Sequence, residues 1–341
     1  MHLKYFLGIA AVVLLFSYAC NNTSKDKKEI PAQQLDATQS SIKILSEKIK
    51  LNPKDGELYN QRASIYLQLK NIDSAFRDIN RALMIDSVKA DYLSTLSDVY
   101  MASGRVQNAL AALEKALKFE PDNIVALLKK AELHLYFEQY GKTMDLTEKV
   151  LKLDINNSKA YFIRGMTFKL KGDTADAIKN IQKTVELDQE NYNAFMQLGI
   201  LYAAKRNKMA VEYYNNALKL NPKSIEAFYA LGMFYQDNGF LNEALSSYTN
   251  LLLIDSTYKF AHYNMGYIHL VYLKMYKEAI KYFNKAIKFA PDYYEAYYNR
   301  GYCFELLGDI LNARKDYKKA LEIKNNYEMA IEGLNRLDKR N

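Results

Sequence analysis

From residue 56 onward the sequence repeats with a period of about 34 residues, and this repetition constrains the fold more than any other feature. The eighth position of each repeat holds a small residue, and the eleventh holds an aromatic or histidine ring. The small residues are Ala63, Ser97, Ala131, Gly165, Gly199, Gly232, Gly266 and Gly301. Small residues at fixed places let two antiparallel helices approach closely, while the large rings fill the remaining space. One such pair cannot bury its apolar face alone, so the sequence predicts an all-α fold of stacked helix pairs.

Eight repeats account for most of the chain, with a predicted helix at each end. We place the repeats at 56–89, 90–123, 124–157, 158–191, 192–224, 225–258, 259–293 and 294–327, the fifth one residue short and the seventh one residue long. Residues 36–55 are predicted as an amphipathic N-terminal capping helix, and residues 328–341 as a C-terminal capping helix and tail. Because every repeat stacks on the next, we expect one long domain.

The repeats resemble the tetratricopeptide repeat, a helix–turn–helix unit. The resemblance is carried by segments such as Phe228-x-x-Leu231-Gly232-x-x-Tyr235, followed by Ala244. It implies an α-solenoid of about eight such units that forms a right-handed superhelix, with the first helix of each unit on the concave face. It also implies a protein that acts by binding other proteins and is not an enzyme.

The N-terminus has the layout of a secretory signal: a positive charge near the start, an apolar run over residues 5–16, and a small residue before Cys20. It resembles a bacterial lipoprotein signal, which implies that residues 1–19 are removed, that Cys20 is lipidated, and that residues 20–35 form a flexible tether. Asn21, rather than aspartate, follows Cys20, and in such lipoproteins this implies the outer membrane; its periplasmic or surface face stays open. Ordinary signal cleavage that leaves Cys20 without lipid is the alternative.

Comparison of the repeats with one another predicts two structural ion pairs. Arginine occupies position seven in the first, fourth and eighth repeats, and in those repeats position 23 is aspartate or asparagine, whereas the other repeats have neither feature. Residues that vary together tend to touch. The predicted ion pairs are Arg62–Asp78 and Arg300–Asp316, and Asn180 is the neutral acceptor predicted beside Arg164.

The concave face that the resemblance implies is predicted to be acidic. Its inward positions carry eight acidic residues, including Asp98, Glu132 and Glu305, against the bases Lys159 and Lys169, a sum of −6. The chain as a whole has a net charge of +8, so the remaining surface is basic. That basic surface either lies against anionic lipid head groups or only keeps the protein soluble.

Tyrosine and methionine side chains gather on this face in the last three repeats, since residues four apart on a helix share a face. Tyrosine offers a large contact area at low entropy cost, and methionine adapts to irregular shapes. Such a groove suits an extended or helical partner segment with apolar and basic side chains. The predicted groove residues are Tyr229, Met233, Asp237, Phe260, Tyr263, Tyr267, Glu295, Tyr298 and Tyr302. Packing of the tyrosines on their neighbours is the alternative interpretation.

Other functions find less support in the sequence. An acidic groove argues against nucleic acid, because phosphate needs positive charge at the contact surface. His134, His262, His269 and Cys303 take packing positions, so we predict no catalytic centre, metal or cofactor. The preferred function is a membrane-tethered scaffold or assembly factor of the cell envelope whose partners are other envelope proteins. The alternatives are a carbohydrate-binding or carbohydrate-active protein that uses the tyrosines, and a purely structural solenoid.

Overall fold

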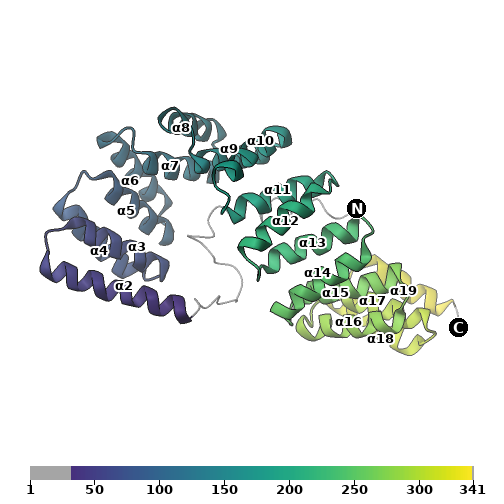
Figure 1. Ribbon diagram of the computed structural model, residues 1–341. Coiled ribbons are helices and arrows are strands. Elements are labelled where there is room, and N and C mark those ends of the chain that lie inside the picture. Colours follow the sequence, from purple (N-terminus) through teal and green to yellow (C-terminus); the bar gives the residue numbers. More distant parts are fainter. Residues whose placement is uncertain (1–31, 340–341) are drawn as a thin grey trace. The chain divides into compact units, whose positions relative to one another are not determined.

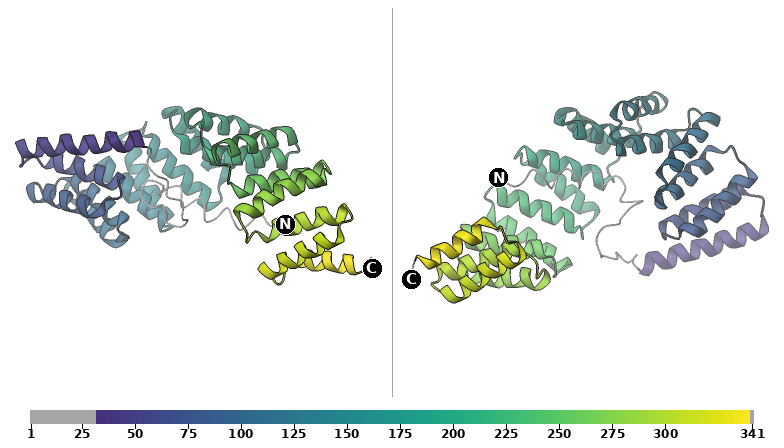
Figure 2. Two further views of the ribbon diagram at one scale, coloured as in Figure 1. Left: turned by 90° about the horizontal axis from the view of Figure 1, so that it is seen from below. Right: turned by 180° about the vertical axis from the view of Figure 1, so that it is seen from behind.

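A computed structural model describes residues 32–339, and over this range every regular element is a helix (Figure 1). Consecutive helices run side by side in pairs, as the periodicity predicts, and further views show the pairs following one another along the chain (Figure 2). The predicted signal segment, Cys20 and most of the predicted tether lie outside the described residues. The superhelical winding of the array stays a prediction.

The chain divides into two compact units between Gln189 and Glu190, where the sequence predicts one long domain. We call them the N-terminal unit and the C-terminal unit. The hydrophobic clusters found among the described residues each lie within one unit. The division has a physical reason: a stacked helix pair contacts only its neighbours, so no common core holds eight pairs together.

The N-terminal unit comprises an end helix and four helix pairs. Its helices are α2 (Ala32–Leu51), α3 (Gly56–Gln68), α4 (Ile72–Ile85), α5 (Ala90–Ala102), α6 (Val106–Phe119), α7 (Ile124–Tyr136), α8 (Tyr140–Leu153), α9 (Ser158–Lys171) and α10 (Thr174–Leu187).

The C-terminal unit comprises four helix pairs and a second end helix. Its helices are α11 (Tyr192–Ala204), α12 (Met209–Leu220), α13 (Ile225–Asp237), α14 (Leu241–Ile254), α15 (Lys259–Tyr267) continued by η2 (Ile268–Tyr272), α16 (Tyr276–Phe289), α17 (Tyr294–Leu306), α18 (Ile310–Ile323) and α19 (Glu328–Asp338).

The N-terminal helix differs in its bounds from the prediction of 36–55. Helix α2 begins at Ala32, so residues 32–35, predicted as part of the tether, are helical, and it ends at Leu51. The Asp55 side chain then caps α3 by accepting a hydrogen bond from the backbone nitrogen of Glu57. Leu45 and Ile49 are buried, as expected of an apolar face that covers the first helix pair.

Every helix pair turns through one residue with a positive φ. These residues are Lys70, Gly104, Glu138, Gly172, Arg206, Gly239, Lys274 and Gly308. They share one position of the repeat, except that Lys274 lies one residue later, because the seventh repeat carries an extra residue. The π-helical turn η2 absorbs that residue without shifting the register of the pair.

Glycines at position eight of the later repeats face large rings of the second helix. A Cβ atom on Gly232 would lie 2.4 Å from Cε1 of Tyr248, and one on Gly266 would lie 2.8 Å from Cε1 of Phe283. Both distances are too short for real contacts. The small–large alternation read from the sequence is therefore a direct packing requirement between the helices of a pair.

Candidate partner-binding site

A chain of aromatic rings runs along α13 and α15 and the residues that precede α15 and α17. We call these rings the aromatic surface: Tyr229, Tyr258, Phe260, Tyr293, Tyr263 and Tyr267. In that order, successive ring centroids lie 5.6, 5.8, 5.9, 4.8 and 6.5 Å apart. Most of these pairs are edge-on or tilted, the arrangements that aromatic pairs favour. The structure thus brings together four of the predicted groove residues, Tyr229, Phe260, Tyr263 and Tyr267.

Tyr258 and Tyr293 belong to this surface, although the sequence analysis did not predict them. They stand at the last position of their repeats, immediately before the next first helix. The second to fifth repeats hold a capping residue at this position, whose side chain accepts a hydrogen bond from the backbone of the following helix: Asn123, Asn157, Asn191 and Ser224. The tyrosines provide no such cap to α15 and α17. This switch from cap to ring is a signal that comparison of the repeats could have found.

Exposure differs along the predicted groove. Phe260 is 39% exposed, whereas Tyr229, Met233, Tyr263 and Tyr267 are half-buried. Each of the half-buried side chains packs against its neighbours and also presents part of itself to solvent. The two interpretations left open by the sequence, packing and binding, therefore both describe these residues.

Tyr298 is a correction to the predicted groove. Its side chain is only 7% exposed, and its ring lies 5.6 Å from that of Tyr317 and 5.5 Å from that of Tyr327. The end helix α19 contributes Ala330 and Leu337 to the same cluster. Tyr298 is therefore a core residue beneath the end helix. Its neighbour Tyr302 stays half-buried, with the guanidinium of Arg336 5.6 Å from its ring.

Asparagines from the next first helix hold the tyrosines in place. Asn299 donates a hydrogen bond of 2.8 Å from Nδ2 to the hydroxyl of Tyr263, and Asn264 donates one of 3.1 Å to the hydroxyl of Tyr248 and one of 3.2 Å to the sulfur of Met233. Burial raises the pKa of Tyr258 to about 12 and also raises the pKa of Tyr263. At neutral pH both phenols are therefore uncharged.

Two predicted acids flank the aromatic surface without ion-pair partners. Asp237 is exposed and Glu295 is half-buried, and neither takes part in an ion pair among residues 32–339. A cation does lie on the rings themselves: Nζ of Lys259 is 5.1 Å from the centroid of Phe260 and 5.6 Å from that of Tyr293. The surface therefore combines aromatic area with two carboxylates that form no ion pair among the described residues and with one ammonium, that of Lys259.

The acidity predicted for the first helices is partly cancelled within the protein. Asp98 pairs with Lys129 and Glu132 pairs with Lys159, each base lying on the next first helix. Glu305 is only 3% exposed and is held by Arg336 of α19. These three carboxylates are structural. The sum of charges at the inward positions could not show this, because the partner of each carboxylate lies outside those positions or in another repeat.

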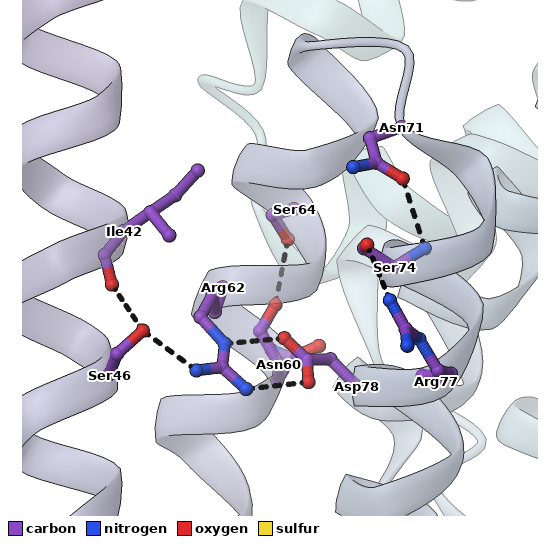
Figure 3. Close-up of polar contacts among 9 residues, drawn as sticks. All are labelled: Ile42, Ser46, Asn60, Arg62, Ser64, Asn71, Ser74, Arg77 and Asp78. Carbon is purple, nitrogen blue, oxygen red and sulfur yellow. Dashed lines mark hydrogen bonds and ion pairs between the residues drawn. The ribbon is translucent and has the colours of Figure 1, made fainter.

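The structure joins both arginine–aspartate pairs. Nε and Nη2 of Arg62 donate to the two carboxylate oxygens of Asp78 at 2.6 and 2.8 Å, and Nη1 donates to Ser46 of α2 at 2.9 Å (Figure 3). Arg300 binds Asp316 at 2.7 and 2.6 Å and reaches Asn284 of α16 at 2.6 Å. Each arginine thus ties three helices together.

The third predicted contact is absent. Asn180 donates its amide to the backbone oxygen of Asp176 at 2.8 Å, and the described contacts include no hydrogen bond from Arg164 to Asn180. Both side chains instead line one pocket of about 460 Å³ in the N-terminal unit.

The remaining chemistry-bearing side chains lie in the core. The ring nitrogens of His134, His262 and His269 contact Gln139, Ser256 and Met265 respectively, and of these partners only Ser256 lies in another repeat, the preceding one. Burial raises the pKa of the Cys303 thiol to about 12, so it is protonated at neutral pH. The described residues contain no cluster of His, Cys, Asp or Glu that could hold a metal ion. None of the helices between residues 32 and 339 has the length and apolar character to cross a bilayer.

Comparison with known families decides the classification. Family models of the tetratricopeptide repeat match residues 56–88, 90–123, 158–191, 192–224, 261–293 and 294–327. The chain belongs to the tetratricopeptide repeat family. Proteins of this family mediate protein–protein interactions.

Relatives and solved structures share this architecture at low identity. The BBSome complex member BBS4 of Bos taurus is 24% identical over 297 residues, which cover 77% of this chain and 57% of the relative. Tetratricopeptide repeat protein 16 of Macaca fascicularis is 23% identical over 317 residues, covering 84% and 36%. The chain thus spans little more than half of the first relative and about a third of the second.

Two solved structures show the same fold. Cut9–Hcn1, an APC/C hetero-tetramer, is matched with a TM-score of 0.50 and 19% identity over 98% of this chain and 64% of that one. Pseudomonas aeruginosa PilF is matched with a TM-score of 0.53 and 18% identity over 60% of this chain and 95% of that one.

Proposed function

We propose that this protein is a non-catalytic scaffold or assembly factor of the cell envelope. In this proposal Cys20 carries the lipid that tethers it to the outer membrane, and the aromatic surface of the C-terminal unit binds an extended or helical segment of a partner protein. The observation that carries the proposal is the connected ring surface, which includes the exposed Phe260 and lies beside Asp237 and Glu295, two acids that form no ion pair among residues 32–339.

The chemistry of the surface defines the partner. Half-buried tyrosines and Met233 offer apolar contact area. Asparagines hold the side chains of Tyr263 and Met233 in place, so these side chains lose little conformational entropy when a partner binds. The carboxylates of Asp237 and Glu295 attract lysine or arginine side chains across a short distance. A segment that alternates apolar and basic residues satisfies both features. The complex-forming relative BBS4 accords with a scaffold role.

Direct binding to peptides tests the proposed surface. We expect the protein to bind basic–apolar peptides in a fluorescence-anisotropy assay and to reject peptides in which glutamate replaces the basic residues. Phe260→Ala should weaken binding at least about tenfold, since a central aromatic contact is worth more than about 1.4 kcal/mol. Glu295→Gln should weaken binding mainly at low salt.

Phe240→Ala provides the matched control, because Phe240 is a phenylalanine of the same unit with nearly the same exposure, 37%. It should leave peptide binding unchanged. Equal losses in the two phenylalanine variants would contradict the assignment of the surface. Binding to a glycan array that depends on Phe260, with no peptide bound, would favour the carbohydrate alternative instead.

The tether requires a separate test, because it rests on the sequence of the first twenty residues. Cells that express the full chain and are fed a fatty-acid analogue should label the protein, and Cys20→Ala should abolish both the label and recovery in the membrane fraction. An unlabelled wild-type protein would overturn the tether and leave the peptide-binding proposal intact.

A further inference from the structure

Three first helices carry the same arginine frame. In each, an arginine at position seven stands between an aromatic residue three positions before it and another four positions after it. The frames are Tyr59–Arg62–Tyr66 in α3, Tyr161–Arg164–Phe168 in α9 and Tyr297–Arg300–Phe304 in α17. The guanidinium of Arg62 lies 5.9 Å from the ring of Tyr59 and 6.0 Å from that of Tyr66. The frame therefore places an arginine of restricted freedom at the seam of three helices.

Two of the three frames hold a carboxylate. Asp78 and Asp316, from the second helix of their own pairs, each accept two hydrogen bonds from the guanidinium, and both are buried. Such a paired contact fixes the carboxylate in the plane of the guanidinium and is stronger than a single neutral hydrogen bond. The first and eighth repeats thus both show that the arginine frame binds a carboxylate.

The frame of the fourth repeat lacks its carboxylate. Asn180 takes the place of the aspartate and donates to the backbone of its own helix, so it offers Arg164 no charge. No ion pair of Arg164 occurs among residues 32–339. In place of the aspartate there is a pocket of about 460 Å³ that Arg164, Tyr161, Phe168 and Asn180 line together.

The other charges of the pocket decide whether an anion can enter it. Lys179 supplies a second cation at the lining, while Glu148 and Asp176 are the carboxylates there. Glu148 pairs with Lys152, whose ammonium lies 2.9 Å from its carboxylate, and it also interacts electrostatically with Arg164. Lys152 lies outside the lining, so two cations and two carboxylates line the pocket. The pairing with Lys152 draws Glu148 away from Arg164 and leaves the guanidinium without a hydrogen-bonded carboxylate.

We propose that this pocket binds a carboxylate group from outside the chain, which takes the position that Asp78 and Asp316 occupy in the other two frames. Arg164 binds it through the same two nitrogens, and Lys179 adds a second charge. The carboxylate comes either from an acidic side chain of a polypeptide or from a free small carboxylic acid. The site lies in the N-terminal unit and does not depend on the aromatic surface.

Side-chain NMR of the full protein tests the proposal, because each arginine Nε–H group gives its own signal. Two probes distinguish the sources: sodium succinate, and a blocked hexapeptide with one glutamate and its glutamine counterpart. We expect a saturable shift of the Arg164 signal with a carboxylate probe and none with sodium chloride at equal ionic strength. Arg62 and Arg300 serve as internal controls, since their frames are filled, and their signals should not move.

Asn180→Asp is the decisive variant. It supplies the missing carboxylate from within, so it should abolish the titration of Arg164 and raise the melting midpoint of the protein. Arg164→Met should abolish binding, and Lys179→Met should weaken it severalfold. At least tenfold tighter binding of the glutamate peptide than of succinate assigns the site to acidic polypeptides, and the reverse assigns it to free acids. A wild-type Arg164 signal that does not saturate, or unchanged binding in Asn180→Asp, overturns the proposal.

Discussion

Replacement of Arg336 by alanine should destabilise the protein through a carboxylate left alone in the core. Glu305 is 3% exposed and accepts hydrogen bonds from Nε and Nη2 of Arg336 at 3.1 and 2.9 Å and from the hydroxyl of Tyr317 at 2.6 Å. Breaking a buried ion pair costs roughly 3–5 kcal/mol, since the remaining charge is uncompensated. The side chain of Arg336 is itself 37% exposed, so water can enter where it was. We therefore expect a loss of about 3 kcal/mol, at the lower end of this range.

Urea denaturation at pH 7 measures this loss, and hydrogen exchange of α19 shows where the structure opens. Arg314→Ala is the matched control, because Arg314 also contacts α19, through Asp338, in a pair that is 60% exposed at the aspartate side chain. An exposed pair contributes about 1 kcal/mol or less. Addition of Glu305→Gln to Arg336→Ala should recover much of the loss, because the buried charge is gone. A loss for Arg336→Ala no larger than that for Arg314→Ala would refute the reasoning.

Three further predictions concern packing, pH and the turns. Gly266→Ala places a Cβ atom 2.8 Å from Phe283 and should cost about 1–3 kcal/mol in thermal denaturation, while Phe283→Leu in the same chain should reduce that cost; additive effects would contradict the packing argument. Burial lowers the pKa of His262 in the folded protein. Its contribution to stability is therefore present above the unfolded pKa of about 6.5 and is lost as the pH falls through the lowered folded pKa. The difference between the melting midpoints at pH 7.5 and 5.5 should be smaller in His262→Gln than in the wild-type protein. Glu138 has a φ of 56°, so Glu138→Gly should raise the free energy of unfolding by roughly 0.5 kcal/mol and Glu138→Ala should not.

Comparison of the repeats predicted those features that depend on a single helix pair. The small residue at position eight and the ring that faces it, as in Gly232 and Tyr248, follow from the periodicity because both helices of a pair recur with fixed spacing. The bidentate contact of Arg300 with Asp316 lies within one pair and appears in the sequence as residues that vary together.

Features that depend on contacts beyond one pair were not predictable in the same way. The burial of Tyr298 and the pairing of Glu305 both require α19, which is not a repeat and has no counterpart to compare. The ammonium of Lys129 pairs with Asp98, which lies on the first helix of the preceding repeat. Position counts treat each repeat separately, so they miss ion pairs between repeats.

In the C-terminal unit, three helices that follow a tyrosine begin without a side-chain cap, and this helps to distinguish tyrosines that pack in the core from tyrosines that form a binding surface. Helices α15, α17 and α19 begin after tyrosines that provide no side-chain cap, and such a cap is worth about 1 kcal/mol. An aromatic pair contributes about 0.5–1.5 kcal/mol, so stability alone gives little reason for the exchange.

The three tyrosines nevertheless differ in what they contact. Tyr327 packs on the buried Tyr298, whereas Tyr258 and Tyr293 lie 5.8 and 5.9 Å from the exposed Phe260. A tyrosine in place of a capping residue therefore has two roles. Before α19 it packs in the core, and before α15 and α17 it forms part of the aromatic surface. If that surface binds a partner, truncation of Tyr327 should lower stability, and truncation of Phe260 should lower affinity while stability changes little.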